Sequence, residues 1–423
     1  MSTETVVAAD APNAAGSPHP SISFASFVSL LAALIALNAM ATDIMLPALP
    51  DMGATLRAAS TTEVQSVITA YLVGFGIGQI FVGLVSDRFG RRVPMLAGLA
   101  VYAIASLVVV ISGDLTTALI ARFVQGVGGA APRVIVTAAV RDCYSDRPMA
   151  KVMSLVMMVF MAAPVVAPAL GQLTLALAPW QVIFAMLALY GGVLLAICWL
   201  RFPETLPPER RIKIRRAEVL AGFGAVLGDR QTMGYVLAAG TVFGALFGYI
   251  NTSQQLLVGV HGLGAWFPAV FAATAVSIAL ASFANARLVE RHGMRLLSHS
   301  ASCLFLLVSL AMLVLDLVGA LSTAWLIGLM VVITWLMGLV FPNFNTLAMT
   351  RQGGVAGIAA SVTGAGSTLL GAVAGYVIGQ AFDGTATPMA LGFVIMAAAT
   401  LAALFFAERG RLFRSAQGAA ADA

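Results

Sequence analysis

The sequence predicts an all-α membrane protein with twelve transmembrane helices in two pseudo-symmetric six-helix bundles. The chain is 60% hydrophobic and only 10% charged, with a mean hydropathy of +0.96, far from the values of soluble proteins. Apolar runs of about 20 residues, long enough to cross a bilayer as a helix, recur along it. Basic residues collect between alternate runs, which is typical of a polytopic membrane protein.

Six predicted spans precede a long polar break, and six follow it. The first six cover 24–48, 63–85, 93–112, 115–140, 148–173 and 180–200, and the others cover 232–258, 266–288, 294–317, 322–348, 355–380 and 387–407. We therefore expect an N-terminal bundle over 23–200, a cytoplasmic linker over 201–231 and a C-terminal bundle over 232–408. Residues 1–22 are expected to form a disordered cytoplasmic tail, and 409–423 a second cytoplasmic tail. Because residues 1–20 contain no basic n-region, a cleaved signal peptide is not expected.

The basic residues predict the orientation of the chain. Of the 23 Lys and Arg residues, Arg57 falls in a loop of one face and Arg122 and Arg133 fall inside a span. The other basic residues fall in tails and loops of the opposite face: Arg88, Arg91, Arg92, Arg141, Arg147, Lys151, Arg201, Arg210, Arg211, Lys213, Arg215, Arg216, Arg230, Arg287, Arg291, Arg295, Arg351, Arg409, Arg411 and Arg414. Cationic loops stay cytoplasmic, so we expect a bacterial inner (plasma) membrane protein with both termini in the cytoplasm. The net charge of +5 then reflects topology and lipid headgroups, not nucleic acid.

Two loops share a pattern that favours internal duplication. Asp87-Arg88-Phe89-Gly90-Arg91-Arg92 follows the second span, and Glu290-Arg291-His292-Gly293-Met294-Arg295 follows the eighth. Both read acid-base-x-Gly-x-base at equivalent places in the two halves. Paired repeats of this kind are a transporter architecture, with the substrate held between the repeats near the membrane midplane.

Glycines recur every four residues in three of the predicted spans. They are Gly74 and Gly78 in the second, Gly240, Gly244 and Gly248 in the seventh, and Gly371, Gly375 and Gly379 in the eleventh. Small residues on one helix face permit close helix packing. Two interpretations stay open, namely static packing and a sliding contact between the second and eleventh spans.

The loop from Gly83 to Arg92 resembles the signature loop of the major facilitator superfamily, Gly-x-x-x-Asp-Arg-x-Gly-Arg-Arg. The resemblance implies a gate at the cytoplasmic end that includes Gly83, Asp87, Arg88, Gly90, Arg91, Arg92 and Asp142. Asp87 could also cap the positive N-terminal end of a neighbouring helix. Asp142, at the end of the fourth span, is the expected partner of Arg91 or Arg92. The alternative is a positive-inside loop without a gating role.

Further segments narrow the family. They are Thr42-Asp43-Ile44-Met45-Leu46-Pro47-Ala48-Leu49-Pro50, Arg122-Phe123-Val124-Gln125-Gly126-Val127-Gly128, Ala167-Pro168-Ala169-Leu170-Gly171 and Asp383-Gly384-Thr385. Together they resemble the Bcr/CflA branch of drug:proton antiporters, over about residues 24–405. The resemblance implies a major facilitator fold and export of small drugs or metabolites against proton entry. It also makes the fifth span an interdomain helix, with Pro164, Pro168 and Gly171 on it, although two glycines of the usual antiporter motif are replaced by Ala167 and Gln172.

Three ionisable residues lie at membrane depth, where charge is costly and therefore usually functional. Asp43 and Arg122 are at similar depths and are expected to meet, with Asp43 as the proton-coupling acid and Arg122 as its partner. The alternative is a permanent salt bridge. Arg133 lies eleven residues after Arg122, on the same helix face as Gln125. This surplus of buried positive charge favours neutral or acidic substrates.

Other polar, aromatic and thioether side chains are candidates for the substrate cavity, although packing or interhelical hydrogen bonding is an equal alternative for each. They are Asn38, Tyr71, Gln79, Gln125, Arg133, Phe160, Met161, Tyr249, Asn251, Gln254, Asn343 and Asn345.

Several function classes lack their motifs in this sequence. Neither Lys151 nor Lys213 follows a Gly-rich phosphate loop, and the histidines and the three cysteines have no hydrolase, metal or disulfide spacing. We therefore expect a non-enzymatic transporter that has no cofactor, uses the proton as its coupling ion and works by alternating access. Its expected partners are a small-molecule substrate and the lipid bilayer, and a monomer is the default. The alternative function is gradient-driven facilitated export of an amino acid or similar metabolite, with Asp43 purely structural.

Overall fold

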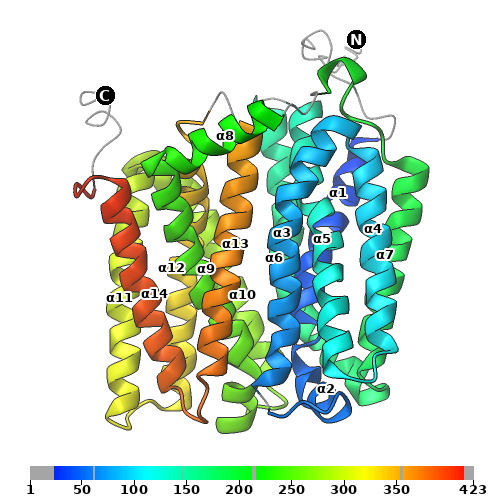
Figure 1. Cartoon of the computed structure of the whole chain (residues 1–423). Coiled ribbons are helices and arrows are strands. Elements are labelled where there is room, and N and C mark those ends of the chain that lie inside the picture. The colour runs from blue at the N-terminus through cyan, green and yellow to red at the C-terminus, as the bar shows by residue number, and fades with distance from the viewer. Residues whose placement is uncertain (1–22, 61, 145, 212–215, 353–355, 414–423) are drawn as a thin grey trace, which may run out of the picture.

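The protein is an all-helical bundle in a computed structural model that describes residues 23–60, 62–144, 146–211, 216–352 and 356–413 (Figure 1). Within these residues, 12 helices are long and apolar enough to cross a membrane. Each closes its own backbone hydrogen bonds, which is the condition for a chain segment surrounded by lipid. The predicted fold class is therefore confirmed: the chain is a multi-pass membrane protein with twelve spans.

The helices of the first half follow the predicted spans, with edges that differ by a few residues. They are α1 (Phe24–Asp43) continuing into α2 (Leu49–Thr55), α3 (Ser66–Phe89), α4 (Arg92–Val110), α5 (Leu115–Cys143), α6 (Asp146–Leu177) and α7 (Gln181–Arg201). Those of the second half are α9 (Arg230–Gln254), α10 (Phe267–His292), α11 (Met294–Leu317), α12 (Thr323–Met349), α13 (Ala356–Gln380) and α14 (Thr387–Ala407). A π-helical turn, Gln255–Val260, extends α9.

Local chemistry explains where several helices begin and end. Asp114 and Asp229 each accept a hydrogen bond from the backbone N–H three residues later, and so satisfy a free donor at the start of α5 and of α9. Gly90 and Gly293 end α3 and α10 with φ of 87° and 78°, a region that favours glycine. The two loops with the repeated pattern thus share a backbone conformation as well as a sequence.

The predicted linker contains a helix. Residues 201–231 were expected to be a loop, but α8 (Arg216–Gly228) occupies part of this segment and lies across the same end of the molecule as the loop between α3 and α4 (Figure 1). Its Val226 is fully buried against Ala359 and Val362 of α13. An apolar helix too short to span the bilayer therefore packs on the second bundle.

The two bundles meet along two helix pairs, α3 with α13 and α6 with α10. Figure 1 shows α3 and α13 side by side at the centre of the molecule. Gln79 of α3 donates to Thr368 of α13 at 3.3 Å, and Gln380 donates to the Thr62 carbonyl at 2.7 Å. Gln172 of α6 donates to the Gly264 carbonyl, which precedes α10, at 3.0 Å.

Seven of the eight regularly spaced glycines pack within their own half. A Cβ on Gly74 or Gly78 would run into α5, and a Cβ on Gly371 or Gly375 would lie 2.6 Å from Phe243 or Phe247 of α9. Static packing is therefore the interpretation that holds for these glycines, whereas Gly379 is the exception, because its Cβ would lie 2.5 Å from Oε1 of Gln65 in the first half. The prediction that the second and eleventh spans contact one another is confirmed. One glycine of α3 that makes this contact is Gly76, which lies on a different helix face from Gly74 and Gly78 and faces Leu369 of α13.

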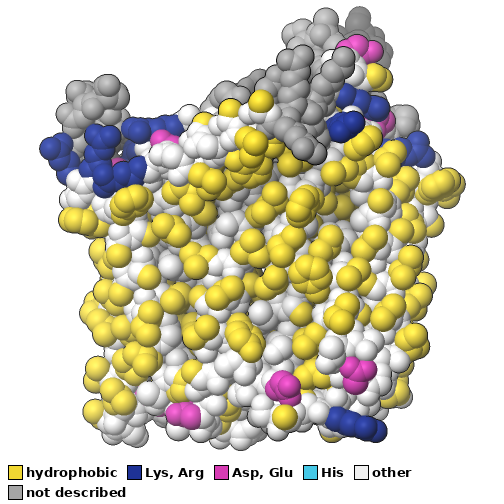
Figure 2. Space-filling model, viewed as in Figure 1, with side chains coloured by type: hydrophobic (Ala, Val, Ile, Leu, Met, Phe, Trp, Pro, Cys, Tyr) yellow, Lys and Arg dark blue, Asp and Glu magenta, His cyan; other side chains and the backbone are white. Residues whose placement is uncertain are grey.

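Charge is distributed unevenly over the surface. In Figure 2, Lys and Arg side chains gather at one end of the molecule and apolar side chains cover the belt below it. The opposite end shows one basic patch, beside the acidic side chains there. This is the surface expected of a helical bundle that spans a bilayer.

Candidate functional site: a charged cluster and a buried acid

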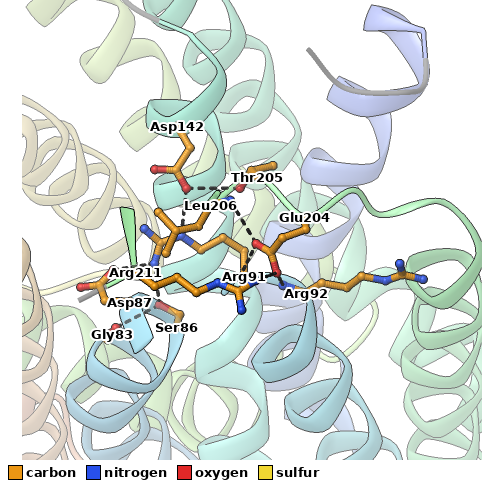
Figure 3. Close-up of polar contacts among 10 residues, drawn as sticks. All are labelled: Gly83, Ser86, Asp87, Arg91, Arg92, Asp142, Glu204, Thr205, Leu206 and Arg211. Carbon is orange, nitrogen blue, oxygen red and sulfur yellow. Dashed lines mark hydrogen bonds and ion pairs between the residues drawn. The ribbon is translucent and has the colours of Figure 1, made fainter. Parts of the chain in front are cut away.

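Arg91 is the centre of a buried ionic cluster between α3, α4 and α5 (Figure 3). Only 3% of the residue is exposed. Its Nε donates to Asp142 at 2.9 Å, and its Nη1 donates to Asp87 at 2.5 Å and to Ser86 at 3.0 Å. The contact expected between Asp142 and Arg91 or Arg92 is therefore present, and Arg91 makes it.

The cluster holds Arg91 in its charged form. Burial disfavours the charge, but hydrogen bonds to Asp142 and Asp87 and their negative charges outweigh it, so the pKa of Arg91 lies above its ordinary value. The guanidinium thus joins the end of α3 to the end of α5 by charge-assisted hydrogen bonds.

Glu204 is a member of the cluster that the sequence analysis missed. Its carboxylate accepts the backbone N–H of Arg91 at 2.8 Å and of Arg92 at 3.3 Å, which are free donors at the start of α4. It also lies 3.7 Å from Arg211, and neighbouring Thr205 donates to Asp142 at 3.2 Å. The chain beyond α7 therefore closes over the α3–α4 loop.

A signal for Glu204 exists in the internal repeat. Phe202-Pro203-Glu204 lies at the end of the sixth span, α7, and Phe406-Ala407-Glu408 lies at the equivalent end of the twelfth span, α14. Glu408 accepts a 2.8 Å hydrogen bond from Arg295 of the second repeated loop. In both halves, an acid after the sixth span thus holds the loop between the second and third. Aligning the halves beyond that loop would have identified it.

The remaining loop residues take different positions. Arg88 is exposed, with its guanidinium 5.1 Å from the Phe89 ring centre, and Arg92 donates to the Trp199 carbonyl at 2.5 Å. A Cβ on Gly83 would lie 2.5 Å from Ser361 Oγ of α13, and one on Gly357 would lie 3.5 Å from Asp87 Oδ2. Asp87 therefore lies at the N-terminal end of α13, where the helix dipole favours a negative charge, as predicted.

Asp43 and Arg122 are both buried, but they do not pair. Among the described residues, Arg122 donates to the carbonyls of Ala41 (3.2 Å) and Val67 (3.2 Å) and to Gln125 (2.6 Å). Its guanidinium also lies over Tyr71, 4.5 Å from the ring centre. The expected Asp43–Arg122 contact is therefore wrong. The reason is that α1 ends at Asp43, so the Ala41 carbonyl has no partner within the helix and competes for the guanidinium.

Asp43 is 4% exposed, and its Oδ1 has no hydrogen-bond partner among the described residues. The short turn that follows α1, Leu46–Ala48, contacts α9 of the second bundle. Asp43 therefore lies close to the boundary between the bundles.

Six of the predicted cavity residues form hydrogen bonds with other side chains of the described part of the chain. Asn38 accepts from Tyr71 at 2.6 Å, Gln125 donates to Ser106 at 2.7 Å, and Tyr249 and Thr274 are 3.3 Å apart. In the second half, Asn343 donates to Asn285 at 2.7 Å. These contacts, with the Gln79–Thr368 pair, favour the packing alternative for the residues that make them.

Five further predicted positions differ in burial. Asn251 is buried, Arg133, Met161 and Gln254 are half-buried, and Asn345 is exposed. The side chain of Phe160 lies outside the described residues.

The predicted interdomain helix, α6, contacts both halves. Pro164 and Pro168 lie inside it, and α6 packs on α10 of the second bundle. A Cβ on Gly171 would run into the Ile44 carbonyl, so this glycine permits close contact with the end of α1 beside Asp43. Gly171 therefore serves a contact inside the first half, whereas the next residue, Gln172, reaches the second. No group of three His, Cys, Asp or Glu side chains that could hold a metal is present in the described part of the chain.

Comparisons with known proteins give the family. A family model described as Major Facilitator Superfamily matches residues 31–353. The chain is 34% identical over 386 residues to an uncharacterized MFS-type transporter, YdgK, of Bacillus subtilis, covering 89% of this chain and 93% of the relative. It is 30% identical over 370 residues to a bicyclomycin resistance protein homolog of Haemophilus influenzae, covering 86% and 91%.

Solved structures share the fold. The human organic anion transporter MFSD10 superposes with a TM-score of 0.67 at 20% identity, over 90% of this chain and 98% of the other. A D-xylose–proton symporter superposes with a TM-score of 0.71 at 13% identity, over 93% and 99%. The family and these relatives are transporters and not enzymes. The chain therefore belongs to the major facilitator superfamily, in its Bcr/CflA-type branch.

Proposed function

We propose that the protein is a proton-coupled exporter of small drugs or metabolites. It works by alternating access in a bacterial inner membrane, with both termini in the cytoplasm. The observation that carries the proposal is Asp43, a carboxyl group buried at the end of the first span, one oxygen of which has no hydrogen-bond partner in the part of the chain that the structure describes. The names of the relatives, a bicyclomycin resistance protein homolog and the multidrug resistance protein D of Escherichia coli, support drug efflux.

The chemistry of Asp43 suits a coupling acid. A buried ionised carboxylate without full hydrogen bonding is costly, and binding a proton removes that cost. Arg122 is held by carbonyls and Gln125, so it fixes the surrounding helices and leaves the carboxylate free to exchange a proton. When the bundles rock apart, water reaches Asp43 and stabilises its charged form.

The cluster around Arg91 supports closure at the cytoplasmic end. Its ionic contacts lie within the first bundle, and it touches the second bundle where Asp87 meets the start of α13. Separation of the bundles then breaks one helix-end contact and leaves the cluster intact. A gate of this kind opens without exposing a buried, unpaired Arg.

Transport in inverted vesicles tests the proposal. Vesicles loaded with a pH-sensitive dye are energised by respiration, candidate drugs are added singly, and wild type is compared with Asp43→Asn. We expect at least one compound to release the proton gradient in wild type and not in the variant. If drug moves equally in both and ignores pH, the facilitated-export alternative is correct and Asp43 is structural.

A further inference from the structure

A small group of buried polar atoms between the bundles has no partner. Asn251 of α9 is 1% exposed, and neither Oδ1 nor Nδ2 of its amide has a hydrogen-bond partner among the described residues. Gln65, which precedes α3, is 2% exposed, and its Oε1 is also without a partner there. The Oγ1 of Thr69, one helical turn after Gln65, is in the same condition.

Two of these groups, Gln65 and Asn251, converge from the two halves on one glycine of α13. A Cβ built on Gly379 would lie 2.5 Å from Oε1 of Gln65 and 3.1 Å from Cβ of Asn251. Any larger residue at this position would fill the space between the two amides. Gln65 of the first bundle and Asn251 of the second therefore face one another across a backbone without a side chain.

An open cavity is lined by residues next to Gln65, namely Val64, which precedes it, and Gln255, which is bonded to it. It has a volume of about 380 Å³ and is lined mainly by apolar side chains of the first half, including Val64, together with Gln254 and Gln255 of the second. Gln65 donates its amide hydrogen to Gln255, the residue at which α9 changes to a π-helical turn. Such turns are common at functional sites, because they interrupt the regular helix and redirect side chains.

We propose that Gln65, Thr69 and Asn251 form a binding site, here called the amide site, for an uncharged group of the transported molecule that both donates and accepts hydrogen bonds. A secondary amide has this chemistry: its C=O pairs with the Asn251 Nδ2 donor, and its N–H pairs with the oxygen of Gln65 or Asn251. Among the described residues, no charged side chain hydrogen bonds to these three, so a neutral group fits and an ion does not. The inference rests on the proposed export function and adds the substrate chemistry.

The orphaned atoms explain why a ligand binds here. A buried amide without partners loses its hydrogen bonds to water and gains nothing in return, whereas a ligand amide restores them. A substrate whose amide nitrogen is methylated still offers an acceptor but no donor. A preference of the protein for the free amide over its N-methylated counterpart therefore measures the hydrogen bonds of the site, because the apolar surfaces of the two compounds are nearly the same.

The experiment uses the full chain in proteoliposomes with an imposed pH gradient. The probes are radiolabelled neutral compounds with a free secondary amide, each paired with its N-methylated counterpart, and tetraphenylphosphonium as a cation without donors. In wild type, we expect each free amide to have a KM about 3- to 10-fold below that of its counterpart, as one or two hydrogen bonds provide. Asn251→Leu raises the KM of the free amide to that of its counterpart and leaves the latter unchanged.

Gln172→Leu is the matched control. Gln172 is another half-buried glutamine that joins the bundles, but its amide is already bonded to Gly264, so this variant keeps the selection. Equal KM values for a free amide and its counterpart in wild type would overturn the amide site. An equal rise in both KM values in Asn251→Leu would also overturn it, because that result indicates that Asn251 only supports the contact between the bundles.

Failure of transport is separated from failure of the site by a binding measurement. If wild type moves none of the probes, the proposed export function is not supported for them, and thermal stabilisation of the purified protein by each pair decides the binding question. Stabilisation by free amides that exceeds that by their counterparts, and that is lost in Asn251→Leu, supports the site. Equal or absent stabilisation in wild type contradicts it.

Discussion

Two charged residues, Arg91 and Asp43, illustrate how burial acts at the residue scale. Both are almost fully buried, at 3% and 4% exposed. Arg91 is surrounded by two carboxylates and a hydroxyl, whereas Asp43 has an oxygen without a partner. The first arrangement is that of a structural anchor. The second arrangement, a buried carboxylate that is not fully hydrogen-bonded, is energetically unfavourable. Ionisable groups in such surroundings are found mainly at functional sites.

Replacing Arg91 is expected to destabilise the fold. In Arg91→Ala, Asp142 and Asp87 lose their partner while their side chains remain mostly buried, at 13% and 30% exposed, so we expect a loss of about 2–4 kcal/mol. Reversible unfolding of the purified protein in mixed micelles measures it. Arg88→Ala is the control, because Arg88 is exposed and its guanidinium lies over the neighbouring Phe89 ring, so its loss should change stability little. Equal effects of the two variants would show that the cluster contributes no stability.

Glycine positions illustrate the element scale, because two faces of one helix have different neighbours. On α3, Gly74 lies against the backbone of α5 in its own bundle, while Gly83 lies against a hydroxyl of α13 in the other. Helical spacing identifies which glycines share a face, but not which neighbour that face contacts. The first contact lies within one bundle, and the second lies between the bundles, where the proposed alternating access would separate it.

Alanine at these two positions should therefore have different effects. In Gly74→Ala the new methyl group meets the Phe123 carbonyl, and the backbone of α5 cannot move without disturbing its packing, so we expect a cost of about 1–3 kcal/mol. In Gly83→Ala the Ser361 hydroxyl can rotate away, and the better helix propensity of alanine offsets the remaining contact. Thermal unfolding of both variants in one detergent distinguishes them. A Gly83→Ala variant as unstable as Gly74→Ala would contradict the assignment of these faces.

At the scale of the whole molecule, the bundles touch along α3–α13 and α6–α10, and these contacts must break if transport requires rocking. Three of the hydrogen bonds across this interface run from a glutamine to a hydroxyl or a carbonyl, and all three are neutral. Such bonds are individually weak, at about 1 kcal/mol, so breaking them adds little to the free energy needed to separate the bundles.

A disulfide across this interface should stop transport. A Cβ on Gly83 would lie 3.7 Å from Cβ of Ser361, which suits the geometry of a disulfide. In a Cys303→Ser background, which removes the exposed native thiol, we expect Gly83→Cys with Ser361→Cys to lose transport on oxidation and regain it on reduction. The drug-driven proton release in inverted vesicles is the readout.

A second disulfide inside one bundle is the control. A Cβ on Gly191 of α7 would lie 3.5 Å from Cβ of Ala103 of α4, and both residues belong to the first half, so Gly191→Cys with Ala103→Cys should keep transport after oxidation. Unchanged transport with a fully formed Gly83–Ser361 bridge would argue against movement at this interface.

Sequence alone was sufficient for the class of protein, the twelve spans, the repeated loop and the contact of Arg91 or Arg92 with Asp142. Hydropathy, span length and loop charge are local properties that determine how each segment inserts into the bilayer. They can therefore be evaluated from the sequence without knowing which helices pack together. Only the tertiary structure decided that Arg122 binds helix-end carbonyls instead of Asp43, that Glu204 closes the loop, and that every glycine of the stripes except Gly379 packs within its own half. Those outcomes depend on which helix faces meet. A polar group pairs with the nearest free donor or acceptor in space, and the sequence contains several possible partners at a similar depth in the membrane.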